Sequence, residues 1–311
     1  MDSIASGTVL ITGPTGGLGR ATALAMARRS AGERPDLILV GRPGRGLDAV
    51  AADARAAGAT VHEVGCDLAD LAQVRRATQQ VRELLASGAT RPLRAVIANA
   101  GVGVADTHKT SADGFELTFA VNYLAHAQLI GGLLADLHTP ARVVLLGSNT
   151  YHQNVFRRIL HVAPARWRDP IDLAAPTPSD VPATIELAGT AYSDSKLALL
   201  YYAHELQRRA PSGVSVVVFE PGFMPGTGLA RDHGAAAQRV GRLVERIPRV
   251  SSPARSGPML ASVALDERWA HLRAGAFVVK DREREVQPFA SDPEREARLW
   301  EATDELLRSA G

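Results

Sequence analysis

Short apolar runs alternate along the chain with longer stretches in which apolar residues recur at helical spacing. The first run, Thr8 to Gly13 (TVLITG), is β-branched and apolar and ends at a glycine, which is typical of a strand buried on both faces. Similar runs stand at 36–41, 60–65, 93–98, 142–147 and 214–219, and helical spacing at 18–29, 47–57, 71–85, 115–137 and 191–209. This alternation predicts an α/β fold, a doubly wound parallel sheet (Rossmann) with helices on both faces.

Two segments interrupt the alternation, and no linker divides the chain. Residues 149–189 are rich in proline, and residues 223–258 combine glycine and proline with one short helical pattern. Long excursions in a compact domain are commonly functional. We therefore expect one domain over residues 1–311, in which these two segments are substrate-side insertions and the first forms a lid. A last strand at 276–280 and a terminal helix at 292–307 complete the prediction.

A glycine-rich loop, Thr12-Gly13-Pro14-Thr15-Gly16-Gly17-Leu18-Gly19, stands between the first strand and the first helix. Glycines let the backbone approach a pyrophosphate, and the helix N-terminus supplies amide donors and partial positive charge. The loop could also be a turn without a ligand. Because it directly follows a strand and opens a helix, its setting favours a dinucleotide site.

The end of the second strand indicates which dinucleotide binds. An acidic side chain at this point would accept hydrogen bonds from the ribose 2′-hydroxyl of NAD, but Gly41 and Arg42 stand there. An arginine can form charge-assisted bonds with a 2′-phosphate and stack on adenine, and Arg45 is a second candidate. The alternative is a solvated loop arginine. We expect NADP(H), and hence an NADP-binding domain.

Composition narrows the functional classes. Hydrophobic residues make up 46% and charged residues 22% of the 311, which is ordinary for a globular protein. A net charge of +2 argues against a nucleic-acid partner. Cys66 is the only cysteine, so we expect neither a disulfide nor a metal site. No basic, apolar leader and no run of about 20 apolar residues is present, so a cytoplasmic protein without a membrane span is expected.

Later residues match the motifs of a known family. Asn99-Ala100-Gly101 follows the fourth strand, Ser148 ends the fifth, Tyr192 to Lys196 has the spacing Y-x-x-x-K, and Pro221-Gly222 follows the sixth. Together with T-G-x-x-x-G-x-G and a helical Asn122, these ordered motifs resemble the short-chain dehydrogenase/reductase family. The resemblance implies an NADP-dependent enzyme that binds a small-molecule ketone or alcohol, and it leaves a homo-oligomer open.

The resemblance also implies a set of cofactor contacts. Asp67 and Leu68 would contact adenine, although Asp67 could equally cap the next helix. The contact to the nicotinamide amide falls on Gly226 or Thr227, because the family's threonine is displaced by one residue. The expected cofactor residues are Gly13, Thr15, Gly17, Leu18, Gly19, Arg42, Asp67, Leu68, Asn99, Ala100, Gly101, Tyr192, Lys196, Pro221, Gly222 and Thr227.

Four residues carry the expected chemistry. Tyr192 and Lys196 are four apart on a predicted helix and therefore share a face. A free phenol has a pKa of about 10, which must fall by roughly 2–3 units for proton exchange near neutrality, and a nearby ammonium and an oxidised nicotinamide would both lower it. By resemblance, Tyr192 donates the proton, Ser148 orients the carbonyl oxygen, and Asn122 distorts its helix and supports a water relay to Lys196. Each residue taken alone could be structural.

The long segment between Ser148 and Tyr192 resembles the corresponding segment of protochlorophyllide oxidoreductases and their retinol-dehydrogenase-like relatives, one branch of the family. The photoenzymes carry a cysteine two positions after the lysine, where this chain has Ala198, which argues against pigment photochemistry. We expect an NADPH-dependent reductase acting on a bulky, largely apolar ketone, or catalysing the reverse oxidation. A related double-bond reductase and a non-catalytic NADP-binding sensor are the alternatives.

Apolar side chains of the two insertions are expected to line the substrate pocket, although each could simply pack the lid. They are Tyr151, Phe156, Ile159, Leu160, Trp167, Phe223 and Met224. His126 and His152 have no metal-ligand partner at suitable spacing, and we interpret both as structural or surface residues. The arginines of the first insertion are interpreted as a solvated loop face rather than an anion site: Arg157, Arg158, Arg166 and Arg168.

Overall fold

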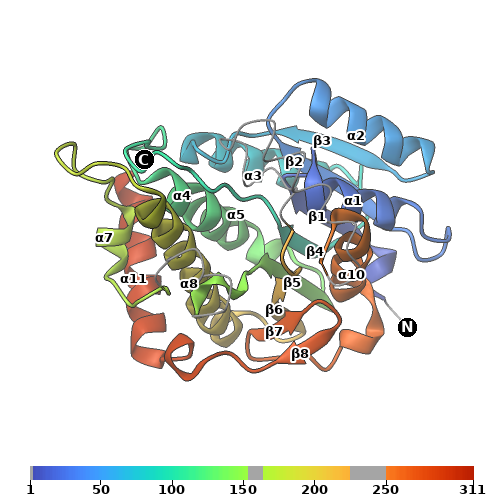
Figure 1. Cartoon of the computed structure of the whole chain (residues 1–311). Coiled ribbons are helices and arrows are strands. Elements are labelled where there is room, and N and C mark those ends of the chain that lie inside the picture. Colours follow the sequence, from blue (N-terminus) through green and yellow to red (C-terminus); the bar gives the residue numbers. More distant parts are fainter. Residues whose placement is uncertain (1–2, 153–163, 225–249) are drawn as a thin grey trace.

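The computed structural model describes residues 3–152, 164–224 and 250–311. One eight-stranded sheet runs through the molecule in the order β3-β2-β1-β4-β5-β6-β7-β8 (Figure 1). Its strands are β1 (Thr8–Thr12), β2 (Asp36–Gly41), β3 (Val61–Gly65), β4 (Leu93–Ala98), β5 (Ala141–Leu146), β6 (Val214–Glu220), β7 (Ala276–Val279) and β8 (Arg282–Arg284). Every neighbouring pair is parallel except β7 and β8, which are antiparallel. The predicted doubly wound sheet is confirmed.

Helices cover both faces of the sheet. The α-helices are α1 (Gly17–Ala27), α2 (Arg45–Ala56), α3 (Leu71–Ala86), α4 (Leu117–Phe119), α5 (Ala125–Leu133), α7 (Pro170–Ala174), α8 (Ile185–Arg209), α10 (Pro253–Leu265) and α11 (Pro293–Ser309). Short 3-10 turns are η1 (Ile4–Ser6), η3 (Leu134–Asp136), η4 (Asn149–Tyr151), η6 (Glu267–Trp269) and η7 (Pro288–Ala290), and η2 (Ala120–Leu124) is a π-helix. One apolar core lies between the sheet and α1, α2 and α10, and the other between the sheet and α3, α5 and α8.

The C-terminal helix α11 packs on the outer side of α8 (Figure 1). As the sequence predicts, Asp292 caps it, accepting hydrogen bonds from the backbone N–H groups of Glu294 and Arg295, and Pro293 opens it. The indole of Trp300 stacks on Tyr202 of α8 with ring centroids 5.6 Å apart. This contact gives α8, which carries Tyr192, a second apolar support beside the sheet.

Three elements differ from the predicted pattern. The expected single helix over 115–137 is broken into α4, the π-turn η2, α5 and η3. Helix α8 begins at Ile185 instead of 191, because the Thr184 hydroxyl accepts a hydrogen bond from the Leu187 N–H and caps an earlier turn. Strand β8 has the sequence Arg-Glu-Arg and is exposed, so no apolar pattern could reveal it.

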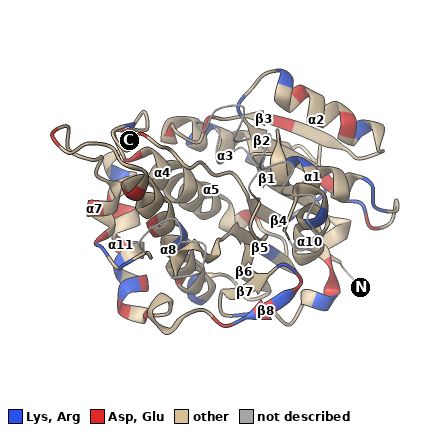
Figure 2. Cartoon of the chain, in the orientation of Figure 1, with Lys and Arg blue, Asp and Glu red and all other residues tan. Residues whose placement is uncertain are grey.

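The surface is mixed in charge, and basic and acidic side chains intersperse along helices such as α2 and α11 (Figure 2). The stretch Leu117–Asp136 is long and apolar enough to cross a membrane, with a mean hydropathy of 1.3, but 72% of its most apolar window is buried inside the protein. It is therefore accounted for as a core segment. The parts 153–163 and 225–249 of the two expected insertions lie outside the described residues.

Candidate active site

A cleft of about 420 Å³ opens at the carboxyl ends of the central strands, where the strand order reverses between β1 and β4. Ligands of open α/β sheets bind at this switch point. The cleft brings together eleven of the expected cofactor residues, namely Gly13, Thr15, Gly17, Leu18, Gly19, Arg42, Asp67, Leu68, Asn99, Ala100 and Gly101. Met224, expected on the substrate side, also lines this cleft.

The loop before α1 fits a dinucleotide pyrophosphate. Gly13 and Gly17 have φ values of +64° and +51°, a region that side chains rarely adopt. A Cβ atom at Gly19 would collide with the Gly13 carbonyl oxygen, and one at Gly16 would meet nothing within 4 Å. The loop therefore turns tightly on the protein side and leaves open space beside the amide groups that begin α1, which is what an approaching phosphate requires.

The adenosine end of the cleft contains Gly41 and Arg42 at the end of β2, and Asp67 and Leu68 after β3. Arg42 is exposed and free to meet a charged ligand. The alternative reading of Asp67 as a helix cap is wrong. Asp70 caps α3, with its Oδ1 accepting a hydrogen bond from the Gln73 N–H at 3.0 Å. Asp67 lies four residues before the helix begins, and its Oδ1 accepts a hydrogen bond from the Ala69 N–H at 3.1 Å.

Tyr192, Lys196 and Ser148 lie together beside the cleft. None of the three is among its lining residues, so the expected cofactor contacts of Tyr192 and Lys196 stay predictions. The Tyr192 hydroxyl is hydrogen-bonded to Ser148, two residues after the end of β5. The Lys196 ammonium lies 5.5 Å from the centre of the Tyr192 ring and donates a hydrogen bond of 2.8 Å to the Leu146 carbonyl. Leu146 itself lines the cleft. The three residues that the sequence places on a strand end and a helix face therefore form one cluster beside the cofactor cleft.

The proton affinities in this cluster differ from the expectation. Burial raises the pKa of Tyr192 to about 12, although the hydrogen bond from Ser148 lowers it in part. Burial lowers the pKa of Lys196 from 10.5 to about 7, so the lysine is only partly protonated at neutral pH. The lysine therefore does not bring the phenol near neutrality in the protein alone. A cationic nicotinamide beside the phenol would favour the phenolate, so the decrease in the Tyr192 pKa requires the bound, oxidised cofactor.

The π-turn η2 is built around Asn122. Its side-chain oxygen accepts the Val102 N–H at 2.8 Å, and its amide nitrogen donates to the Val102 carbonyl at 3.0 Å and to the Ser195 hydroxyl at 3.1 Å. Ser195 lies between Tyr192 and Lys196 on α8. These tertiary bonds hold Asn122 toward α8 and account for the distorted helix that the resemblance implies. The water relay to Lys196 stays a prediction.

His126 links this turn to the cofactor strand. The Thr12 hydroxyl accepts the N–H groups of Asn99 and Ala100, both at 3.0 Å, so its own hydrogen is left for His126 Nε2 at 2.9 Å. Nδ1 of His126 then carries the ring hydrogen and donates it to the Asn122 carbonyl at 3.1 Å. Burial lowers the pKa of His126 to about 4, so the ring is neutral. Its interpretation as a structural residue agrees with these contacts.

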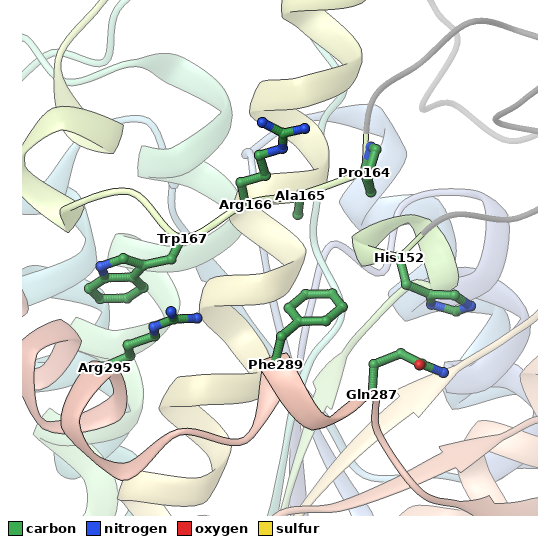
Figure 3. Close-up of a pocket in the computed structure, with 8 residues that line it drawn as sticks. All are labelled: His152, Pro164, Ala165, Arg166, Trp167, Gln287, Phe289 and Arg295. Atoms are coloured by element: carbon green, nitrogen blue, oxygen red, sulfur yellow. The ribbon is translucent and has the colours of Figure 1, made fainter.

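A second cavity, of about 870 Å³, lies between the first insertion and the C-terminal tail. Figure 3 shows Trp167 and Arg295 at one end, His152 and Gln287 at the other, and Phe289 between them. Trp167 lines this cavity as expected, and its ring also packs edge-on against Tyr201 at 5.6 Å. Pro164, Ala165 and Arg166 complete the described lining.

The other expected substrate residues are placed differently. Tyr151 is 1% exposed and belongs to the core, where its hydroxyl accepts the Gln287 N–H at 3.2 Å, so it supports the second cavity from beneath and does not line it. Phe223 is half exposed. Phe156, Ile159, Leu160, Arg157, Arg158, Gly226 and Thr227 lie outside the described residues.

Other predictions for the site have mixed outcomes. Pro221 and Gly222 directly follow β6, but neither lines either of the two cavities. Cys66 lies in the cleft wall as a free thiol, and burial raises its pKa to about 12, so it is unreactive near neutrality. In the described parts of the chain, no group of three His, Cys, Asp or Glu residues could hold a metal.

The sequence interpretation overlooked Glu220. This carboxylate ends the otherwise apolar strand β6 and is 5% exposed. Its charge acts on Tyr192 and raises the pKa of the phenol further. A single acidic residue after Val-Val-Val-Phe, directly before Pro221-Gly222, was the available signal.

Comparison with known proteins gives the family. The sequence profile of short chain dehydrogenases matches residues 7–163, half of the chain. The chain belongs to the short-chain dehydrogenase family. A Streptomyces protein that carries the name daunorubicin C-13 ketoreductase DnrU is 33% identical over 95% of this chain and 91% of its own length. This short-chain dehydrogenase is thus an oxidoreductase, with relatives that match it along nearly its whole length.

Other relatives lie in the branch that the sequence suggested. Human retinol dehydrogenase 13 is 30% identical over 96% of this chain and 84% of its own length, and rice protochlorophyllide reductase B is 28% identical over 98% and 78%. Among solved structures, an uncharacterised protein of Mycobacterium paratuberculosis superposes with a TM-score of 0.68 at 27% identity, covering 99% of this chain and 96% of its own. A Burkholderia cenocepacia short chain dehydrogenase, solved with NADP, has a TM-score of 0.63 at 22% identity, covering 90% and 98%, and supports the fold.

Proposed function

We propose that this enzyme reduces the carbonyl group of a bulky, largely apolar ketone with NADPH, or oxidises the corresponding alcohol. The observation that carries the proposal is the Ser148–Tyr192 hydrogen bond beside Lys196, which itself bonds Leu146 in the wall of a cleft shaped for a dinucleotide. A phenol and a serine hydroxyl that meet at one point can both bond a single carbonyl oxygen. The partly exposed Tyr192 can therefore reach a substrate oxygen.

The chain's own residues have distinct tasks in this proposal. When bound, NADPH supplies the hydride. Tyr192 donates its hydroxyl proton to the carbonyl oxygen, and Ser148 fixes the direction of that oxygen. Lys196 holds the cofactor ribose and contributes positive charge near the phenol. Arg42, exposed in the cleft beside Gly41, binds the 2′-phosphate, which an acidic residue at that point would repel.

The second cavity supports a bulky substrate. His152, on its wall, is four residues after Ser148, and Trp167 and Phe289 offer aromatic surface to a flat, apolar body. The ketoreductase name of the Streptomyces relative agrees with a carbonyl substrate. The polar groups around the rim, among them Gln287 and Arg295, would orient polar substituents.

Reduction of a carbon–carbon double bond is the alternative, because protochlorophyllide reductases match nearly the whole chain. Ala198 stands where the photoenzymes have cysteine, which favours the ketone. A purely sensory NADP-binding role has no observation in its favour, since the Ser148, Tyr192 and Lys196 set is intact. A cytoplasmic location stays part of the proposal.

The test is an NADPH-oxidation screen in the dark against polycyclic and aromatic ketones, with products identified by mass. We expect alcohols as products. Tyr192→Phe should keep NADPH affinity and lose turnover by a factor of about 10² to 10⁴, the usual effect of removing a positioned acid. Retention of more than a tenth of the activity in this variant would place the proton donor elsewhere. Products reduced at a carbon–carbon bond, or turnover only in light, would favour the alternative.

A further inference from the structure

A buried carboxyl group lies close to the proposed proton donor. Glu220 is the last residue of β6 and only 5% exposed. Side chains alternate along a strand, so Glu220 points to the same face as Val218, which packs in the core that contains α8. Phe219 points to the opposite face. The carboxyl group therefore lies on the α8 side of the sheet, the side from which Tyr192 comes.

The carboxyl joins two loops of the site. It accepts hydrogen bonds from the backbone N–H groups of Asn149, next to Ser148, and of Gly222. The strand beneath is fixed, because the Glu220 carbonyl accepts the Lys280 N–H at 2.8 Å. Gly222 has a φ of +86°, and a Cβ atom there would meet the Lys280 side chain at 2.6 Å. Glu220 thus holds the Ser148 loop and the Gly222 loop at a set separation.

The second carboxyl oxygen, Oε2, is buried and has no hydrogen-bond partner among the residues that the structure describes. Leaving a charged group's oxygen unpaired in the interior typically costs about 1–3 kcal/mol or more, so a structural tie alone does not explain a carboxylate here. Two charged or titratable groups in the described residues interact with the Glu220 carboxyl group. The positive charge of Lys280, on the turn after β7, favours the ionised form of Glu220. The negative charge of Glu220 in turn disfavours the phenolate form of Tyr192 on α8.

We propose that Glu220 is a positioning residue for Tyr192: it ties the Ser148 loop to the Gly222 loop, and its negative charge keeps the proton on the Tyr192 hydroxyl. The inference rests on the proposed function, in which the protonated phenol is the acid for ketone reduction. Burial raises the pKa of Glu220 itself, but at the alkaline pH where a phenol titrates the carboxyl is ionised. Glu220 then extends to higher pH the range in which Tyr192 can donate its proton.

Two substitutions separate the effect of the Glu220 hydrogen bonds to the two loops from the effect of its negative charge. Glu220→Gln keeps an acceptor oxygen for the two N–H groups and removes the charge, whereas Glu220→Asp keeps the charge and shortens the reach. The midpoint of Tyr192 ionisation is measured from the near-ultraviolet tyrosinate absorbance of the NADP⁺-saturated enzyme, with Tyr192→Phe as the subtracted reference. NADPH affinity and melting temperature are measured beside it. Glu285→Gln, at an exposed site, controls for net charge.

We expect Glu220→Gln to lower the midpoint by about half a pH unit or more, roughly a threefold change in proton affinity, with NADPH affinity little changed. Glu220→Asp should leave the midpoint near that of the unmodified enzyme and weaken NADPH binding or lower the melting temperature. If Glu220→Gln does not fold, Glu220→Met removes the same charge with an unbranched apolar side chain and should lower the midpoint in the same way.

Equal midpoints in the unmodified enzyme and Glu220→Gln, or in the unmodified enzyme and Glu220→Met where only that variant folds, would overturn the charge effect. A Glu220→Asp variant as stable and as tightly binding as the unmodified enzyme would overturn the tie. The titration needs no ketone. Failure of the substrate screen would therefore refute the proposed function without deciding this inference.

Discussion

At the scale of the residue, burial changes the pKa of Lys196. The protein without cofactor holds this lysine at a pKa of about 7, against 10.5 for a free side chain. Between these values the unfolded chain binds more protons than the folded one, so stability must rise as pH rises. Burial raises the pKa of Cys66 above its ordinary value of 9.0, so this thiol opposes the gain only above pH 9. We therefore place the observable window between pH 7 and 9.

Urea unfolding of the cofactor-free protein should show a gain of about 2 kcal/mol from pH 7 to pH 9. Lys196→Met, which removes the titrating group and keeps an unbranched apolar stem, should lose most of this gain. The difference between the two proteins at each pH isolates the contribution of Lys196. An identical pH dependence in both proteins would show that the ammonium is solvated and not buried.

At the same scale, we expect Arg42 to determine cofactor choice. It is exposed at the adenosine end of the cleft, with neutral Gly41 before it. We expect NADPH to bind at least about tenfold more tightly than NADH, which is 1.4 kcal/mol. Arg42→Ala should weaken NADPH selectively, whereas Arg45→Ala, at the start of α2 and outside the cleft lining, is the matched control. Equal affinities for the two cofactors in the unmodified enzyme would contradict the assignment.

At the scale of elements, Thr12 joins β1 to β4 and to the π-turn. Its hydroxyl accepts two backbone N–H groups and donates to His126. Thr12→Val is nearly isosteric but leaves these buried groups without a partner, so we expect a loss of about 2–4 kcal/mol in the free energy of unfolding.

Thr22→Val is the control for this substitution. Thr22 is equally buried, but its hydroxyl donates only to the Leu18 carbonyl one helical turn before it, at 2.8 Å. Its replacement should cost about 1 kcal/mol or less, since that carbonyl keeps its helical bond. Chemical denaturation of both variants measures the difference. Equal losses would mean that Thr12 contributes packing alone.

At the scale of the whole molecule, the second cavity is assembled from distant parts of the chain. Trp167 comes from the first insertion and Phe289 and Arg295 from the C-terminal tail. Trp167→Ala should raise KM for a bulky aromatic ketone several-fold and affect a small ketone less, with NADPH affinity unchanged, because the cofactor cleft is built from other elements. Steady-state kinetics with one large and one small ketone measure this.

Trp300→Ala is the matched control for the cavity. Trp300 stacks on Tyr202 between α11 and α8 and does not line the cavity, so its removal should lower the melting temperature without selecting between ketones. Trp167 also contacts Tyr201 and lies 5.7 Å from the Arg295 guanidinium, so some loss of stability is expected there too. If Trp167→Ala changed both ketones alike, Trp167 would pack the fold and would not select the substrate.

The amino-acid sequence by itself determined the sheet, the cofactor loop and the order of the motifs. Buried parallel strands are continuous apolar runs, and a glycine-rich turn between a strand and a helix is typical of a dinucleotide site. Both features can therefore be predicted from short stretches of the sequence. β2 and β4 were predicted at the residues where the structure has them, Asp36–Gly41 and Leu93–Ala98, and each bound of the other predicted strands differs by at most one residue.

Only the tertiary structure decided what each polar group in the site does. The π-turn at Asn122 depends on Val102 and on Ser195 of another helix. The buried position of the Tyr151 side chain depends on its hydrogen bond with Gln287 in the tail. Glu220 gained its relation to Tyr192 because β6 and α8 meet across a core. Residue spacing fixes which side chains share a face, but proton affinity depends on burial and on neighbours remote in the sequence, which only the folded chain brings together.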